Sequence, residues 1–101
     1  DWIQLGQNID GEPTALMMYQ CSGFSVSISA DGNTVAIGNP GSDGQSGWAA
    51  GSVRIFEFDG SSWIQKGQSL FPTNNNNNQI FGFSVSLNDS ANILAVAAPT
   101  E

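Results

Sequence analysis

The residues that could carry chemistry are few in this chain. Its 101 residues include no histidine and a single cysteine, Cys21. A Cys–His nucleophile pair therefore cannot form within the chain, and neither can a metal site that combines cysteine with histidine. An internal disulfide is also impossible, so we expect Cys21 to be a small core residue. We find no catalytic set among the remaining side chains, and the sequence predicts a protein that is not an enzyme.

Acidic side chains are the most numerous reactive groups, and several of them precede glycine. Nine carboxylates against two cations give a formal net charge of −7. This balance argues against nucleic acid and anionic membranes as partners. Paired carboxylates can hydrolyse glycosides, but Asp10, Asp31 and Asp59 each stand directly before a glycine, where a turn explains them. Glu57 is expected to pair with Lys66 across a hairpin, as a surface ion pair.

The segment GSDGQSGWAA, residues 41–50, holds the candidate ligand-binding residues. Its glycine and serine content predicts a loop. Trp48 is a large aromatic side chain within it, which could stack on a sugar, anchor a protein partner or fold over the edge of a sheet. Asp43 and Gln45 add polar atoms to the same loop. We expect Trp48, Asp43 and Gln45 to form any ligand site that the loop carries.

The segments on either side of this loop have the sequence patterns of β-strands. Residues 24–29, FSVSIS, alternate apolar side chains with serine, which is the period of a pleated strand. Apolar runs between turn signals predict three further strands, at residues 34–38, 51–58 and 62–70. No segment has convincing helical periodicity. The sequence therefore predicts an all-β fold made of four-stranded antiparallel meanders.

Asp-Gly pairs are expected to close two of the hairpins, because this pair readily supplies the backbone angles of a tight turn. The first pair is at residues 31–32 and the second at residues 59–60. A two-residue loop at the second pair places Phe56 opposite Trp63. Such an aromatic pair stabilises a hairpin by roughly 0.2–1 kcal/mol.

The chain repeats itself with a period of about 60 residues. Residues 23–40 and 82–99 are identical at 8 of 18 aligned positions, at an offset of 59. WIQLGQNI begins at Trp2 and WIQKGQSL at Trp63, at an offset of 61. Self-similarity at one spacing is typical of repeat architectures. We predict that residues 23–70 form one complete four-stranded set. Residues 1–22 would be the outer strand and connector of the preceding set. Residues 71–101 would be an Asn-rich connector and the first two strands of the next set.

Two motifs of this repeat resemble those of a known family. Phe81-Gly82 precedes the first strand of the second copy, and Ala97-Ala98-Pro99 closes its second strand. These motifs resemble the FG-GAP repeat of integrin α-subunit-like β-propellers, from which the first copy departs at Ser22-Gly23 and Gly38-Asn39-Pro40. The resemblance implies four-stranded blades of a seven-bladed propeller, of which this chain supplies about 1.7. Neighbouring blades would then come from the same longer chain or from other subunits.

The resemblance also raises the question of calcium. Blades of integrin propellers often bind Ca²⁺ through alternating acidic residues in the loop after the second strand, and Ca²⁺ takes six to eight oxygen ligands. The matching loop here, NPGSDGQSGWAAG, holds one carboxylate, that of Asp43. Calcium would bind such a loop poorly. We therefore expect no metal and no other cofactor.

The leading functional hypothesis is a non-catalytic scaffold for protein interaction or adhesion, with a protein or a glycan as its partner. One alternative is a lectin-like module that uses Trp48 as a sugar platform, and another is a structural subunit of a larger assembly. No apolar run is long enough for a membrane-spanning helix, and this piece shows no signal peptide. Asn88-Asp89-Ser90 matches the acceptor pattern for N-glycosylation. This pattern favours a secreted route and an extracellular or cell-surface location.

Overall fold

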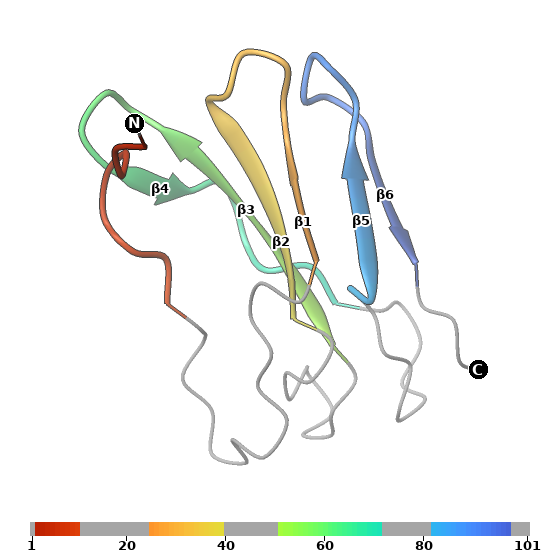
Figure 1. Cartoon of the computed structure of the whole chain (residues 1–101). Helices are drawn as coiled ribbons and strands as arrows, with labels where there is room; N and C mark the ends of the chain where they lie inside the picture. The colour runs from red at the N-terminus through yellow and green to blue at the C-terminus, as the bar shows by residue number, and fades with distance from the viewer. Residues whose placement is uncertain (1, 11–24, 40–50, 72–81, 98–101) are drawn as a thin grey trace.

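The computed structural model describes residues 2–10, 25–39, 51–71 and 82–97. All secondary-structure elements within these ranges are strands, and none of these residues is helical (Figure 1). The strands are β1 (Ser25–Ile28), β2 (Thr34–Asn39), β3 (Ser52–Phe58), β4 (Trp63–Gln65), β5 (Ser84–Leu87) and β6 (Leu94–Ala97). A four-stranded sheet has the order β1-β2-β3-β4, and a two-stranded sheet joins β5 to β6. Every pair is antiparallel, so the predicted all-β class is confirmed for the described part of the chain.

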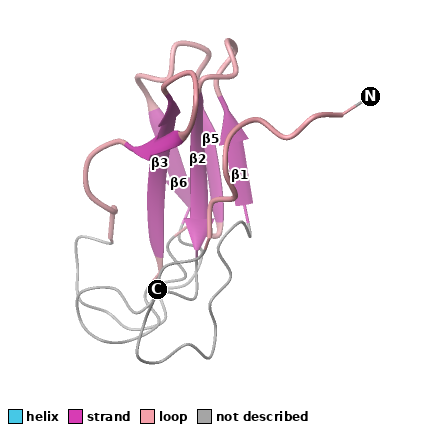
Figure 2. Cartoon of the chain, turned by 90° about the vertical axis from the view of Figure 1, so that its left-hand side faces the viewer, coloured by secondary structure: helices cyan, strands magenta, loops and turns pink. Residues whose placement is uncertain are grey.

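The described strands form two layers. The β5–β6 sheet stands beside β1 in Figure 1 and lies behind β1 and β2 in Figure 2. The buried side chains between the layers are those of Ala36, Val53 and Val85. Partly buried apolar residues surround these three, namely Ile55, Leu87, Leu94 and Val96. The core is therefore shared between the two sheets, and each sheet covers one face of the other.

The turn between β3 and β4 is longer than the sequence predicted. The Asp59 carboxylate accepts hydrogen bonds from the backbone N–H groups of Ser61 and Ser62, both at 2.8 Å. These bonds hold a four-residue loop, so Phe58 lies opposite Trp63. The predicted two-residue loop, with Phe56 opposite Trp63, is wrong by two residues. The rings of Phe58 and Trp63 are 5.1 Å apart at an interplanar angle of 52°.

The same register contradicts the predicted ion pair between Glu57 and Lys66. Glu57 lies opposite Ile64, and both Glu57 and Lys66 are exposed. The backbone N–H of Lys66 donates instead to the carbonyl of Ile55, at 2.7 Å. No ion pair joins Glu57 to Lys66 in the described structure.

The predicted fourth strand, residues 62–70, is also too long. β4 ends at Gln65, and Gly67 then adopts a φ of 79°, which an extended strand cannot accommodate. The chain meets β3 again at Leu70, which forms an isolated antiparallel bridge with Val53. A short strand, a bend and a single bridge replace the continuous strand.

Residues 2–9 repeat this bend but form no strand, contrary to prediction. Gly6 has a φ of 77°, against 79° for the equivalent Gly67. Gln4 donates to the side chain of Asn8 at 2.8 Å, as Gln65 donates to Ser69. The two copies of WIQ-x-GQ therefore share a local conformation. Strand β4 forms because it pairs with β3, and residues 2–9 have no such partner among the described residues.

Candidate functional site: the contact between the repeated hairpins

The predicted ligand-binding residues Trp48, Asp43 and Gln45 lie outside the described residues, and so does Cys21. The expectation that the loop around Asp43 binds no calcium therefore stays a prediction. Within the described ranges, no group of three or more His, Cys, Asp or Glu side chains could hold a metal ion. The feature of these ranges that can be built residue by residue is the contact between the β1–β2 and β5–β6 hairpins.

Two serine hydroxyls of β1 join the hairpins. Ser25 Oγ donates to the carbonyl of Gly82 at 2.9 Å, across 57 residues of chain. Ser27 Oγ accepts the backbone N–H of Leu87 at 2.9 Å, across 60 residues. The alternation of these serines along the strand was visible in the sequence, but their partners in another sheet were not.

Glycines permit the close approach that these bonds require. A Cβ on Gly38 would clash with the Gly82 carbonyl and would stand 2.5 Å from Ser25 Oγ. A Cβ on Gly82 would stand 2.7 Å from the carbonyl oxygen of Ser52, and Gly82 also has a φ of 91°. Glycine is the residue that satisfies both the left-handed angle and the missing space. The Phe-Gly motif thus supplies a glycine at the point where the two sheets meet.

Each hairpin has two unlike faces, because residues directly opposite in a pair share a face. The serine face of the β1–β2 hairpin consists of Ser25, Ser27, Ala36 and Gly38, and its apolar face of Val26, Ile28, Val35 and Ile37. The serine face of the β5–β6 hairpin consists of Ser84, Ser86, Ala95 and Ala97, and its apolar face of Val85, Leu87, Leu94 and Val96. The contact joins the serine face of the first hairpin to the apolar face of the second. The small residues of the first hairpin therefore pack against the large apolar residues of the second.

Outside this contact, the apolar face of the first hairpin is open along β1 only, because Ile37 on β2 is 7% exposed. Val26 and Ile28 on the first apolar face are 60% and 59% exposed. All four residues of the second serine face are exposed. The described structure thus exposes the β1 part of one apolar face and the whole of one serine face.

The outer part of the four-stranded sheet carries a second contact between copies. The side-chain amide of Gln7 accepts the N–H of Trp63 at 2.9 Å and donates to its carbonyl at 2.8 Å. Trp63 Nε1 donates to the carbonyl of Leu5 at 2.8 Å, and the buried guanidinium of Arg54 reaches the carbonyl of Asp10 at 2.9 Å. Residues 5–10 are thereby fixed against β3 and β4.

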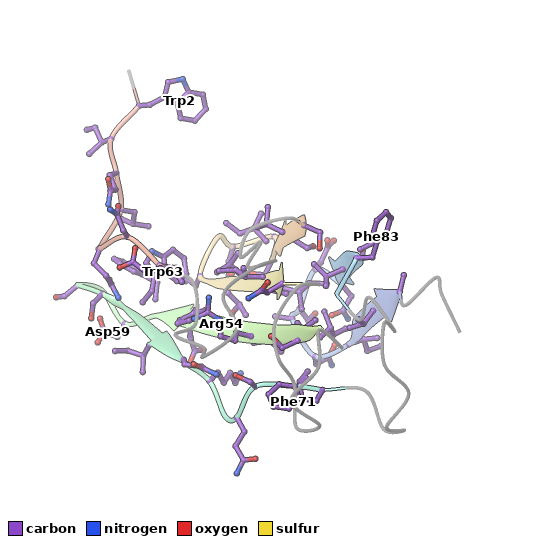
Figure 3. All side chains as sticks on the ribbon, turned by 90° about the horizontal axis from the view of Figure 1, so that it is seen from below. Trp2, Arg54, Asp59, Trp63, Phe71 and Phe83 are labelled. Carbon is purple, nitrogen blue, oxygen red and sulfur yellow. The ribbon has the colours of Figure 1, made fainter. Side chains whose placement is uncertain are left out.

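Trp2 differs from Trp63, although the two residues occupy equivalent positions of the repeat. Trp63 is half-buried and its ring lies against Gly6 and Phe58. Trp2 is fully exposed and projects away from the sheets (Figure 3). The difference follows from the partners, because the strand that would pair with Trp2 is not among the described residues.

Asn88, the predicted glycosylation acceptor, anchors the turn between β5 and β6. Its Oδ1 accepts the backbone N–H groups of Asn92 and Ile93 at 3.0 and 2.9 Å. Its Nδ2 donates to the side chain of Asn92 at 2.6 Å. Asn88 is half-buried in this arrangement. The amide thus has a structural role in the turn, and its glycosylation stays a prediction.

The carboxylates of the first copy are turn acceptors. Asp31 Oδ1 accepts the Ser29 hydroxyl at 2.7 Å and the Asn33 N–H at 3.0 Å. These bonds favour the charged form, and they hold the pKa of Asp31 below its ordinary value. The N–H groups of Ser62 and Ser61 lower the pKa of Asp59 in the same way. Both shifts are explained by the turns and by no further partner.

Comparisons with known proteins add no relative: no family model, curated protein or solved structure matches this chain. The described ranges contain no helix of the length and apolarity that crossing a membrane would require.

Proposed function

We propose that this chain is a repeat segment of an FG-GAP-like β-propeller and serves as a non-catalytic interaction scaffold of a surface or secreted protein. Its strands hold the loops at the sheet ends in place, and the loop with Trp48, Asp43 and Gln45 contacts a protein partner. Loops on a rigid frame usually carry function. No cofactor takes part.

One observation carries this proposal, namely the spacing of the bonds between the hairpins. Ser27 meets Leu87 at a separation of 60 residues, which is the period of the sequence repeat. A contact at this spacing joins each copy to the next one, so a longer series would form a continuous stack. Radial stacking of four-stranded sheets, in which each covers its neighbour, is the architecture of a propeller. The antiparallel order β1-β2-β3-β4 agrees with the order expected for one blade.

Two other functions remain as alternatives, each with its own observation. A lectin-like module is favoured by the aromatic Trp48 in a loop of small and polar residues. A structural subunit of a larger assembly is favoured by the open apolar face, where Val26 and Ile28 are more than half exposed. In a structural subunit these side chains would be buried by neighbouring subunits. In a scaffold, the partner would instead contact the loop that carries Trp48, Asp43 and Gln45.

Binding measurements on matched variants test the proposal. The wild-type chain, Trp48→Ala and the pair Asp43→Asn with Gln45→Ala are screened against a glycan array and a panel of cell-surface protein ectodomains. Ser61→Ala is the control, because Ser61 is exposed in a different turn and only its backbone N–H bonds to Asp59. We expect a protein ligand whose binding falls in the loop variants and persists in the control.

Other outcomes would decide against this reading. A glycan ligand that requires Trp48 would replace it with the lectin-like function. Binding that none of the loop substitutions alters would remove the loop from the function. Loss of the contact between β1 and β5, seen as absent nuclear Overhauser effects between Ser27 and Leu87, would remove the repeat architecture itself.

A further inference from the structure

We propose that residues 5–7 form a strap that closes the outer edge of β4, with the side-chain amide of Gln7 in the place of a peptide group from a neighbouring strand. An open strand edge is a template for pairing with another chain. The strap therefore keeps a second copy of this chain from adding its own β4 to the sheet. The inference goes beyond the scaffold function and does not depend on which ligand the scaffold binds.

The ladder between β3 and β4 shows which backbone groups point to that edge. The N–H of Lys66 donates to the carbonyl of Ile55 at 2.7 Å, so these two residues form a hydrogen-bonded pair. Hydrogen-bonded and non-hydrogen-bonded pairs alternate along an antiparallel ladder. Trp63 and Gln65 therefore occupy non-hydrogen-bonded positions, and their N–H and carbonyl groups point away from β3. They are the two outward positions of this three-residue strand.

Gln7 occupies the first of these positions. Its Oε1 accepts the N–H of Trp63 at 2.9 Å, and its Nε2 donates to the Trp63 carbonyl at 2.8 Å. A residue of an incoming antiparallel strand would make the same two bonds. A carboxamide can take its place because it carries both a donor and an acceptor, as the peptide group does. A second strand can therefore pair with Trp63 only by displacing Gln7.

The rest of the strap holds this amide in position. Trp63 Nε1 donates to the carbonyl of Leu5 at 2.8 Å. Gly6 lies against two rings, because a Cβ there would stand 3.0 Å from Trp63 Cδ1 and 3.1 Å from Phe58 Cε1. Gly6 also has a φ of 77°, an angle that glycine adopts readily. The strap is thus bonded to Trp63 on both sides of Gly6.

A side chain also closes an edge group of the β5–β6 sheet. Asn88 donates its N–H to the carbonyl of Ile93 at 3.1 Å, so Leu87 occupies a non-hydrogen-bonded position and its N–H points away from β6. Ser27 Oγ accepts this N–H. In both sheets the capping residue belongs to the first copy of a repeated segment and the capped residue to the second. Capping of strand edges by polar side chains is therefore a recurring feature of the chain.

Disulfide trapping can detect pairing between the β4 strands of two copies. An antiparallel pair that uses both outward positions places Ile64 opposite Ile64 of the second copy, in a non-hydrogen-bonded pair. The Cα atoms of such a pair are about 4.5 Å apart, a spacing that a disulfide can span. Ile64 is exposed. The parent for the test is therefore the full chain with Ile64→Cys and with Cys21→Ser, which removes the natural thiol.

Gln7→Ala in this parent is the decisive variant. With oxidised glutathione as the oxidant, it should form cross-linked dimers about tenfold faster than the parent, because a second strand no longer displaces two hydrogen bonds. Moderate salt screens the repulsion between copies that each carry a net charge of −7. The dimers are measured on non-reducing gels. Equal reactivity of the thiol toward a small disulfide reagent shows that its exposure is unchanged.

Gln68→Ala is the matched control. Gln68 is the equivalent glutamine of the second WIQ-x-GQ motif. It is exposed like Gln7, but the side-chain bonds to the backbone of Trp63 come from Gln7. The control should cross-link at the rate of the parent. Gly6→Ala should instead act in the direction of Gln7→Ala, because its Cβ would lift the strap from the rings.

Amide hydrogen exchange identifies the group that the strap protects. In the chain with Ile64 intact, the N–H of Trp63 should exchange about tenfold faster in Gln7→Ala than in the wild type. The N–H of Ile64 points toward β3 and should exchange at an unchanged rate.

Four results would overturn the inference. These are equal cross-linking rates with and without the Gln7 side chain, equal acceleration by Gln7→Ala and Gln68→Ala, faster cross-linking without faster exchange of the Trp63 N–H, and no cross-linked dimer in any variant. The last result would show that β4 does not accept a second strand. If any of them is found while nuclear Overhauser effects between Ser27 and Leu87 persist, the scaffold proposal stands and only the strap fails.

Discussion

The β1–β2 and β5–β6 hairpins have the same sequence pattern and the same strand pairing, yet their surroundings differ. Val85 is 8% exposed because it packs on the first hairpin, whereas its equivalent Val26 is 60% exposed. Ala36 is fully buried, and its equivalent Ala95 is exposed. The repeat therefore fixes local conformation, and the neighbour that is present decides which face is buried. The residue type alone does not predict which of two equivalent residues is buried.

The turns of the hairpins show the same division. Gly32 in the first turn has a φ of 77°, and the equivalent Ala91 in the second has a φ of 59°. Ser29 Oγ accepts the N–H of Thr34 in the first turn, as Asn88 Oδ1 accepts that of Ile93 in the second. Different side chains thus produce one turn shape. Substitutions at the contact between the copies and in their turns test this comparison.

Placing a methyl group at position 38 should have the largest effect. In Gly38→Ala the new Cβ would meet the Gly82 carbonyl, and relieving that clash requires the two sheets to separate. We expect a loss of about 3 kcal/mol in the free energy of unfolding, at the upper end of overpacking effects, measured by urea denaturation. The matched control is Ala97→Gly, at an exposed position, which should change the free energy by less than about 1 kcal/mol. Equal effects at the two sites would contradict the observed packing.

Truncation of the valine between the sheets comes next. Val85→Ala should destabilise the chain by about 2 kcal/mol, because most of a buried valine side chain is lost. Val26→Ala, at the equivalent exposed position, should cost less than about 0.5 kcal/mol. Both are read from denaturation midpoints. A larger loss from Val26→Ala would mean that the first hairpin is covered in solution.

Exchanging the turn residues should give smaller effects of opposite sign. Gly32→Ala places a side chain at a left-handed angle, at a cost of about 1 kcal/mol, and no atom lies within 4 Å of the new Cβ to add a clash. Ala91→Gly removes the same strain from the second turn. The gain there should be only a few tenths of a kcal/mol, because glycine also raises the entropy of the unfolded chain. Thermal denaturation measures both, and effects of the same sign would refute the equivalence of the turns.

Acid should weaken the first hairpin and spare the turn of the second. The pKa of Asp31 is lowered in the folded state by the bonds from Ser29 and Asn33. Its carboxylate therefore stabilises the fold above its ordinary pKa of about 4, and this contribution disappears as the pH falls through the lower folded pKa. Asp59 behaves in the same way, whereas the Asn88 amide does not titrate.

A pH series of urea denaturation tests this difference. Asp31→Asn combined with Asp59→Asn should flatten the loss of stability between about pH 5 and pH 2. Asp89→Asn is the control, because Asp89 is an exposed residue of the second turn. An acid dependence that is the same in the double variant and the wild type would show that these turns do not respond to protonation.

Much of the fold could be predicted from short-range patterns. Alternation in FSVSIS and the repeat at residues 82–99 located β1, β5 and β6, and the Asp-Gly pairs located two turns. The length of the turn at Asp59 could not be predicted, because it depends on a carboxylate that binds two N–H groups beyond it. The end of β4 at Gln65 depends likewise on the left-handed angle of Gly67.

The contact between the hairpins could not be predicted from the sequence, for a different reason. Ser25 and Ser27 belong to the alternating pattern that predicted a strand, but the pattern does not reveal whether a hydroxyl bonds to a neighbouring strand, to another sheet or to water. Their partners lie 57 and 60 residues away, and only the packing of two sheets brings them together. Trp48, Asp43 and Gln45 were proposed from composition alone, and their role awaits the binding measurements described above.

The spacing of the Ser27 to Leu87 bond has a consequence for how such a chain can lengthen during evolution. The two halves of the contact lie one period apart, and each copy carries both an acceptor hydroxyl (Ser27 or Ser86) and a donor N–H (that of Ile28 or Leu87). Tandem duplication of a sixty-residue unit therefore adds a donor and an acceptor at the same time. The enlarged product inherits compatible junctions without compensating mutations. Insertion of a fraction of a unit would separate hydroxyls from their amides, and selection should therefore favour lineages that differ by whole units.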